Sequence, residues 1–245
     1  MNRYKLIVEY DGTPFCGWQR QGGVLSIQQC LEESVQPLIK DLVVMSGAGR
    51  TDAGVHALGQ VAHFETEKNL DAFRIQECMN AYLVDYPISV LSVEQVDEDF
   101  HSRFSAVERF YIYKIVNRRS KLALDINRAW KILRPLDAKR MDNIAQILVG
   151  KHDFSAFRAK GCQALSPIKT LNSISVERFG EQVIIKLAAK SFLYHQVRNI
   201  VGSLQKVGTG EWSEDEFLSV FKSKDRSQAA ATAPACGLYF WKVRY

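Results

Sequence analysis

The sequence predicts an α+β protein with largely antiparallel sheets. In both halves of the chain, apolar runs of strand length alternate with segments of helical periodicity, and hairpins occur among them. The composition of the 245 residues, 47% hydrophobic and 24% charged, is typical of a globular protein with one large or two small domains. We place the boundary near Ser105, between an N-terminal half over residues 1–105 and a C-terminal half over residues 106–245. No Pro/Gly-rich linker separates the halves, so we expect them to share an interface.

In the N-terminal half, the apolar runs predict strands over residues 4–10, 42–46, 60–66 and 88–96. A first helix is predicted from Ser26, which fits a capping box with Gln29, and a second over residues 70–83. The apolar stripe of the first helix consists of Ile27, Leu31, Val35 and Leu38. Pro37 is expected to kink or end this helix. Two aromatic residues ahead of it are expected to pack in the core: Phe15 and Trp18.

In the C-terminal half, strands are predicted over residues 110–116, 129–132, 174–178, 183–188 and 238–243. The third and fourth of these form a hairpin around Gly180. Helices are predicted over residues 141–148, ended by Gly150, and over residues 195–207. Ser213 and Glu216 have the spacing of a capping box for one further helix.

The loop over residues 47–57 joins two of the predicted strands. Its glycines and alanines leave little side-chain bulk, so another backbone or a substrate can approach it closely. The side chains capable of chemistry are Arg50, Thr51, Asp52 and His56. The glycines are spaced neither as a phosphate-binding loop nor as a dinucleotide fingerprint. From these residues alone, an Asx-turn at Asp52 and a surface ion pair at Arg50 remain alternatives to catalysis, and His56 is expected to be structural.

Five segments along the chain carry a family resemblance. Residues 49–57 read GRTDAGVHA, and residues 10–21 before them read YDGTPFCGWQRQ. After them come FHSRFSA at 100–106 with YIY at 111–113, then VRNIVG at 197–202, and finally the triplet Gly-Leu-Tyr at 237–239. In this order, and over nearly the whole chain, the segments resemble the TruA family of tRNA pseudouridine synthases. The resemblance implies the pseudouridine synthase fold, with two α/β halves around a continuous sheet and a cleft between them.

The resemblance also implies an activity, the isomerisation of uridine to pseudouridine at positions 38, 39 and 40 in the anticodon stem-loop of tRNA. The reaction breaks the C1′–N1 bond, turns the uracil and joins C1′ to C5. It involves no net oxidation or reduction, so no cofactor and no metal is expected. It needs a carboxylate nucleophile, which the resemblance assigns to Asp52. Whether Asp52 attacks the uracil ring or the ribose C1′ is left open.

Four more site residues follow from the resemblance. Tyr111 is expected to stack on the target base and to assist proton removal, and Arg198 to form an ion pair that keeps Asp52 ionised. Arg50 and Arg103 are expected to contact RNA, with Arg50 filling the gap that the flipped base leaves. From pattern alone, Tyr111 is more typical of a packed, half-buried strand residue, and Arg198 is more typical of the solvent-facing side of a helix.

Charge and cysteine usage bound the partners and the compartment. The net charge of +5 favours a polyanionic partner, here tRNA, and the family works as a homodimer. No apolar run has membrane-spanning length and the start lacks a signal-peptide layout, so no membrane partner is expected. The five scattered cysteines form no C-x-x-C pair, which favours reduced thiols and a cytoplasmic location.

Two other functions remain open at this point. One is a non-catalytic tRNA-binding or folding protein of the same fold. The other is a carboxylate-based hydrolase that releases free uracil from a nucleoside. The presence of Asp52, Tyr111 and Arg198 together favours the isomerase over the non-catalytic protein.

Overall fold

The computed structural model describes residues Met1–Tyr245 and divides into two compact units. The first unit comprises Met1–Val107 with Tyr239–Tyr245, and the second comprises Glu108–Leu238. The predicted mixed α/β character with largely antiparallel sheets is confirmed. The predicted halves and the observed units differ mainly in the last strand, which joins the first unit because it pairs with a strand there.

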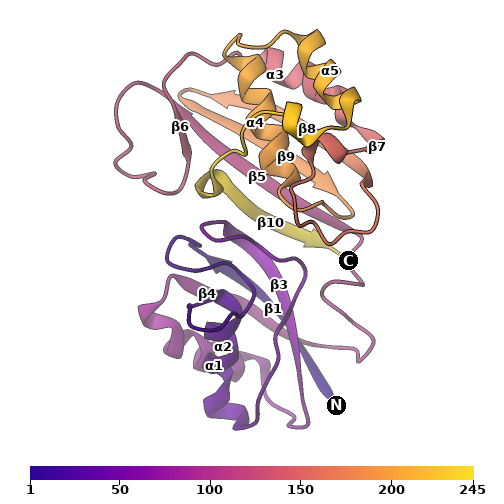
Figure 1. Ribbon diagram of the computed structural model, residues 1–245. Helices are drawn as coiled ribbons and strands as arrows, with labels where there is room; N and C mark the ends of the chain where they lie inside the picture. The colour runs from indigo at the N-terminus through magenta and orange to yellow at the C-terminus, as the bar shows by residue number, and fades with distance from the viewer. The chain divides into compact units, whose positions relative to one another are not determined.

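The sheet of the first unit has the strand order β4-β1-β3-β10 (Figure 1). β1 (Asn2–Tyr10) lies between β4 (Ile88–Val96) and β3 (His56–Thr66) and is antiparallel to both. β10 (Leu238–Arg244) is parallel to β3. The short β2 (Ser46–Gly47) is antiparallel to β3 farther along that strand. The loop between β2 and β3 is the one that carries Asp52.

Two helices complete the first unit. α1 (Ile27–Ile39) begins at Ser26, whose Oγ accepts a hydrogen bond from the Gln29 N–H at 3.2 Å. α2 (Ala72–Tyr82) packs against α1 and β4, and the one-turn 3₁₀ helix Leu83–Asp85 follows it (Figure 1). Pro37 lies inside α1, which continues through it for two further residues. The helix therefore does not end at the proline, and Lys40 in the left-handed conformation closes it.

The prediction of a strand over residues 42–46 is wrong except at Ser46. Leu42 and Val44 are 90% and 71% exposed, whereas Met45 is buried. The Met45 N–H donates to Glu32 Oε1 at 3.1 Å and the Met45 carbonyl accepts from Gln28 Nε2 at 3.1 Å. The apolar alternation is thus present, but side chains of α1 take the place of a neighbouring strand.

The sheet of the second unit has the strand order β5-β9-β8-β7. The antiparallel β8 (Ile168–Phe179) and β9 (Gln182–Ala189) form the predicted hairpin, which turns at Gly180 with φ of 58°. β5 (Glu108–Asn117) is antiparallel to β9, and β7 (Gly150–Asp153) to β8. β6 (Trp130–Ile132) is parallel to β5.

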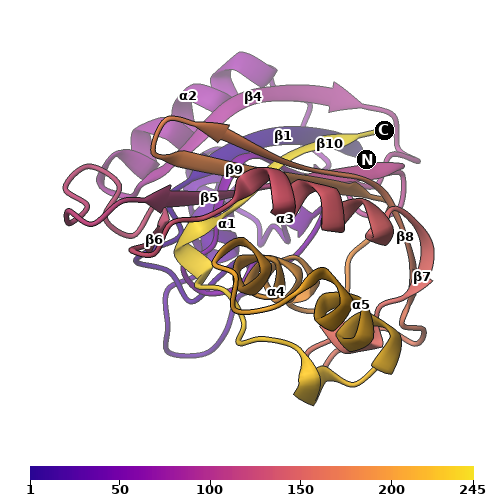
Figure 2. The ribbon, with the colours of Figure 1, turned by 90° about the horizontal axis from the view of Figure 1, so that it is seen from above.

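Helices cover one face of this second sheet (Figures 1 and 2). α3 (Ala138–Ala145) packs on β8 and on α4 (Gln196–Gly208), and α5 (Glu214–Ser223) packs on α4. The predicted capping box of α5 is present, with both Ser213–Glu216 hydrogen bonds formed. The one-turn 3₁₀ helices of this unit are Gln146–Leu148, Ser155–Phe157, Arg226–Gln228 and Ala235–Gly237. None of the protein's helices has the length and apolar composition needed to cross a membrane.

Candidate active site

The Asp52 loop, residues 47–57, is hydrogen-bonded to β3 at its start. The Ala48 N–H donates to Val61 O of β3 at 2.8 Å, and Gln60 Nε2 donates to Gly49 O at 2.8 Å. Within the loop, the Val55 N–H donates to the backbone carbonyl of Asp52 at 3.1 Å. These backbone groups lie outside regular secondary structure, and they form their hydrogen bonds with β3 or within the loop.

The segment between β1 and α1 supplies further contacts to this loop. The Trp18 N–H donates to Thr51 O at 3.0 Å, and Gly17 forms an isolated antiparallel bridge with Asp52. The Tyr10 hydroxyl lies 2.8 Å from Thr51 Oγ1. Burial raises the pKa of Tyr10 to about 12, so this hydroxyl remains protonated at neutral pH. The residue next to Asp52 is thus fixed through both its carbonyl and its hydroxyl.

Glycines permit this close approach. A Cβ on Gly12 would lie 2.0 Å from Val55 O, and one on Gly17 would lie 2.5 Å from Thr51 O. Gly17 also has φ of 111°, a conformation that other residues rarely adopt. A Cβ on Gly47 would lie 2.6 Å from the ring of Trp18, which is buried as predicted. The protein's own opening segment is therefore one of the backbones that the bare loop admits.

His56 ends the loop as a buried residue. Its Nδ1 accepts a hydrogen bond from the Gly12 N–H at 3.1 Å and lies 3.1 Å from Asp11 Oδ1. Its ring stacks on Tyr239 of β10, with the ring centroids 4.7 Å apart. These contacts fit the structural role expected for His56.

The loop over residues 101–105, which contains Arg103, is anchored beside β2. The Ser102 N–H donates to His63 Nδ1 at 3.2 Å, and Ser102 Oγ donates to Ser46 O at 2.7 Å. Burial lowers the pKa of His63 to about 4, with smaller contributions from His101 and Arg3. His63 is therefore neutral at pH 7 and able to accept the bond from Ser102.

The tip of the 101–105 loop presents an aromatic ring and a cation. Phe104 is 74% exposed. The Arg103 guanidinium lies 5.5 Å from the centroid of the Phe104 ring, and the His101 ring lies 4.4 Å from it on centroids. An exposed ring next to a guanidinium is a surface that suits a nucleobase with its phosphate.

In the second unit, Tyr111 and Arg198 lie on regular elements. Tyr111 is a half-buried residue of β5, opposite Leu187 of β9, and its ring is T-shaped to that of Phe192, with the ring centroids 5.1 Å apart. Arg198 lies in the first turn of α4, and its Nε donates to Ala233 O at 2.8 Å. The Ala233 N–H in turn donates to Arg198 O at 3.1 Å. The Arg198 side chain is thus anchored, unlike the solvated helix residue that pattern alone allowed.

Comparison with known proteins identifies the family. The family model described as tRNA pseudouridine synthase matches residues 6–105 and 144–245. The chain belongs to the tRNA pseudouridine synthase family. It is 52% identical to tRNA pseudouridine synthase A of Afipia carboxidovorans over the whole of both chains. It is 51% identical to the protein of that name from Paramagnetospirillum magneticum, over the whole chain and 96% of the relative.

The residues that the family resemblance assigns are divided between the two units. Asp52, Arg50 and Arg103 lie in the first unit, whereas Tyr111 and Arg198 lie in the second. Arg50 is exposed on the Asp52 loop. No group of three or more His, Cys, Asp or Glu side chains is placed to hold a metal ion.

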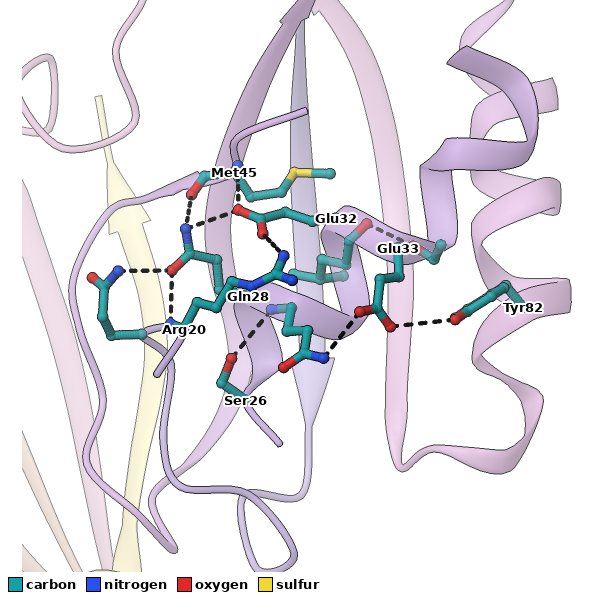
Figure 3. Close-up of polar contacts among 11 residues, drawn as sticks. Arg20, Ser26, Gln28, Glu32, Glu33, Met45 and Tyr82 are labelled. Carbon is teal, nitrogen blue, oxygen red and sulfur yellow. Dashed lines mark hydrogen bonds and ion pairs between the residues drawn. The ribbon is translucent and has the colours of Figure 1, made fainter. Parts of the chain in front are cut away.

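Sequence reasoning missed two polar residues of α1 beside the loop. Gln28 and Glu32 are buried, although both residue types are usually exposed on helices. Their i, i+4 spacing next to the apolar stripe was the available signal, since it places both on one side of the helix. Figure 3 shows them directed toward Arg20 and Met45.

Proposed function

We propose that this protein isomerises uridine to pseudouridine at positions 38, 39 and 40 in the anticodon stem-loop of tRNA. The observation that carries the proposal is an Asp52 loop whose backbone is hydrogen-bonded to β3 and to the segment around Gly17 and Trp18, in a chain about half identical to synthases over its full length. The relatives' shared name favours this enzyme over a non-catalytic tRNA-binding protein of the same fold.

In the proposed mechanism, Asp52 is the carboxylate nucleophile. Asp52 forms a bond to the substrate that breaks again before the product leaves. The C1′–N1 bond breaks, the uracil turns while it stays bound, and C1′ joins C5. The C5 proton leaves and N1 gains a proton, so the net reaction is an isomerisation. Fixed loop geometry supports this role because a nucleophile already in position does not have to be ordered during the reaction. The attack on the uracil ring and the attack on ribose C1′ use the same carboxylate, and both remain compatible with the proposal.

Tyr111 and Arg198 are proposed to assist Asp52. Tyr111 stacks on the target base, and its hydroxyl assists removal of the C5 proton. Arg198 is the cation that keeps the Asp52 carboxylate ionised, because a nearby guanidinium lowers a carboxyl pKa. The bond from Arg198 Nε to Ala233 supports this role because it fixes the plane of the guanidinium group.

RNA binding is proposed for Arg50 and Arg103. Arg103 stands beside the exposed Phe104, so the pair offers a phosphate contact and a stacking surface together. The net charge of +5 supports a polyanionic substrate. Following the family, we also infer a homodimer. All five cysteines are free, which supports a reducing compartment such as the cytoplasm.

Tritium release tests the proposal. Transfer RNA labelled with tritium at uridine C5 loses the label to water when C1′ joins C5. We expect release by the purified protein without added metal or cofactor, together with pseudouridine in the digested RNA. Free uracil in the products would identify a hydrolase instead, and tRNA binding without tritium release would identify the non-catalytic alternative.

A further inference from the structure

Glu32 is a buried carboxylate that the proposed reaction does not use. It lies on α1 with only 5% of its surface exposed, one turn after the buried Gln28. Burying a charged group is unfavourable unless hydrogen bonds compensate for the lost water. The hydrogen-bond partners of Glu32 therefore indicate its role.

The side chains of Gln28 and Glu32 bind two other segments (Figure 3). Glu32 Oε1 accepts from the Met45 N–H at 3.1 Å and from Gln28 Nε2 at 2.9 Å, while Glu32 Oε2 accepts from Arg20 Nη1 at 3.0 Å. Gln28 Nε2 also donates to Met45 O at 3.1 Å. Gln28 Oε1 accepts from the Arg20 N–H at 3.0 Å and from Gln19 Nε2 at 3.0 Å. Both backbone polar groups of Met45 are thus bound by α1.

Both segments connect to the Asp52 loop, which is also hydrogen-bonded to β3. Met45 directly precedes β2, from which the loop starts. Arg20 follows Trp18, whose N–H donates to Thr51 O at 3.0 Å, and Gly17 bridges to Asp52. Gln28 and Glu32 therefore hold Met45, which precedes the loop, and Arg20, which lies in the segment hydrogen-bonded to it.

We propose that Glu32, together with Gln28, is a positioning residue for Asp52, an inference that rests on the proposed function. Only a group that accepts hydrogen bonds through both oxygens satisfies Met45, Gln28 and Arg20 at once, and an ionised carboxylate does so. An amide at position 32 would direct its NH₂ at a donor on one side. The resulting shift of Met45 or Arg20 would move Asp52, and a displacement of about 1 Å costs roughly 100-fold in rate.

The test compares Glu32→Gln with Glu33→Gln, a matched control at the next position of the same helix. Glu33 accepts hydrogen bonds from Gln29 Nε2 at 2.9 Å and from the Tyr82 hydroxyl at 3.4 Å, on the side toward α2 (Figure 3). Single-turnover tritium release, tRNA Kd and Tm are measured for both variants. We expect Glu32→Gln to lower the single-turnover rate about 10- to 100-fold with Kd within about twofold of wild type. Glu33→Gln should keep both values within about twofold.

The outcomes separate this inference from the proposed function. Wild-type release with an equally fast Glu32→Gln variant would overturn the positioning role alone, as would a loss confined to Kd or to Tm. Absence of release by the wild type would overturn the proposed function and this inference with it. If Glu32→Gln does not fold, Gln28→Met removes the bonds to Met45 and Arg20 at similar volume. The same loss of rate at unchanged Kd is expected for it, and a wild-type rate would overturn the inference.

Discussion

Asp52 and Tyr111, two residues assigned to one reaction, are held in different ways. Tyr111 lies inside β5, whose register with β9 continues on both sides of it. Asp52 lies in an irregular loop whose backbone depends on β3 and on the segment after β1. A strand positions its residues through its own ladder, whereas a loop has to be positioned by its neighbours.

This difference shows where distant substitutions should affect the reaction. In the first unit, three buried polar side chains form hydrogen bonds with segments in or next to the Asp52 loop: Gln28, Glu32 and Gln60. Tyr111 differs in that strand pairing with β9 supplies its backbone bonds.

The largest effect is expected at Asp52. Asp52→Asn is isosteric but lacks the anionic nucleophile, so tritium release should fall by at least about 10⁴-fold. The tRNA Kd and the Tm should stay near the wild-type values, because the loop is held through its backbone. Near wild-type turnover, with deamidation back to Asp excluded by mass spectrometry, would remove Asp52 from the mechanism.

Tyr111 tests the other side of the comparison. Tyr111→Ala should lower turnover roughly 10- to 100-fold, since loss of one stacking ring costs about 1–3 kcal/mol. Tyr111→Phe keeps the ring, so tRNA should bind normally while product formation stalls, if the hydroxyl assists proton removal. An active Tyr111→Phe variant would limit the residue to stacking. Full activity of Tyr111→Ala would show that another residue holds the base.

The 101–105 loop is also held by a neighbouring element, through the bond from the Ser102 N–H to His63 of β3. The pKa of His63 is about 4 in the folded protein and near 6.5 unfolded, so only the unfolded chain gains this proton as the pH falls through 6.5. Stability should therefore decrease between pH 7.5 and pH 5.5, by about 1 kcal/mol from this group. Urea unfolding at the two pH values measures the decrease. His63→Asn should reduce the pH dependence, and an equal dependence in variant and wild type would exclude His63 as its source.

The smallest effect is expected at Phe104. Phe104→Ala should weaken tRNA binding about fivefold, whereas Phe104→Trp should preserve it, because the ring offers one stacking surface. Phe73 is a matched control, since it is 69% exposed against 74% for Phe104 and lies on α2. Filter binding of all three variants gives the comparison. Equal weakening by Phe73→Ala would mean that the effect is not specific to the 101–105 loop.

Sequence patterns identified the regular elements because their signals are local. The Ser213 capping box and the hairpin at Gly180 depend on residues within a few positions of one another, and both are present. The low side-chain bulk of the Asp52 loop was also evident from its local sequence. That low bulk predicted close backbone approach, although the approaching segment, around Gly12 and Gly17, lies more than thirty residues upstream.

The errors and omissions have one physical origin. Residues 42–46 alternate as a strand does, but Met45 bonds to side chains instead of to a neighbouring strand. Gln28 and Glu32 were missed for the same reason, since a helix pattern does not reveal which distant backbone its polar residues bind. Long-range contacts between side chains and backbone carry no periodic signal.

We infer that this protein forms pseudouridine in tRNA through Asp52. The most direct test is the mapping of pseudouridines in tRNA from cells that lack the protein and carry either the wild-type or the Asp52→Asn gene. We predict that positions 38, 39 and 40 remain uridine without the protein, regain pseudouridine with the wild type and do not regain it with Asp52→Asn. Pseudouridine that persists at these positions without the protein, or returns with Asp52→Asn, would contradict it.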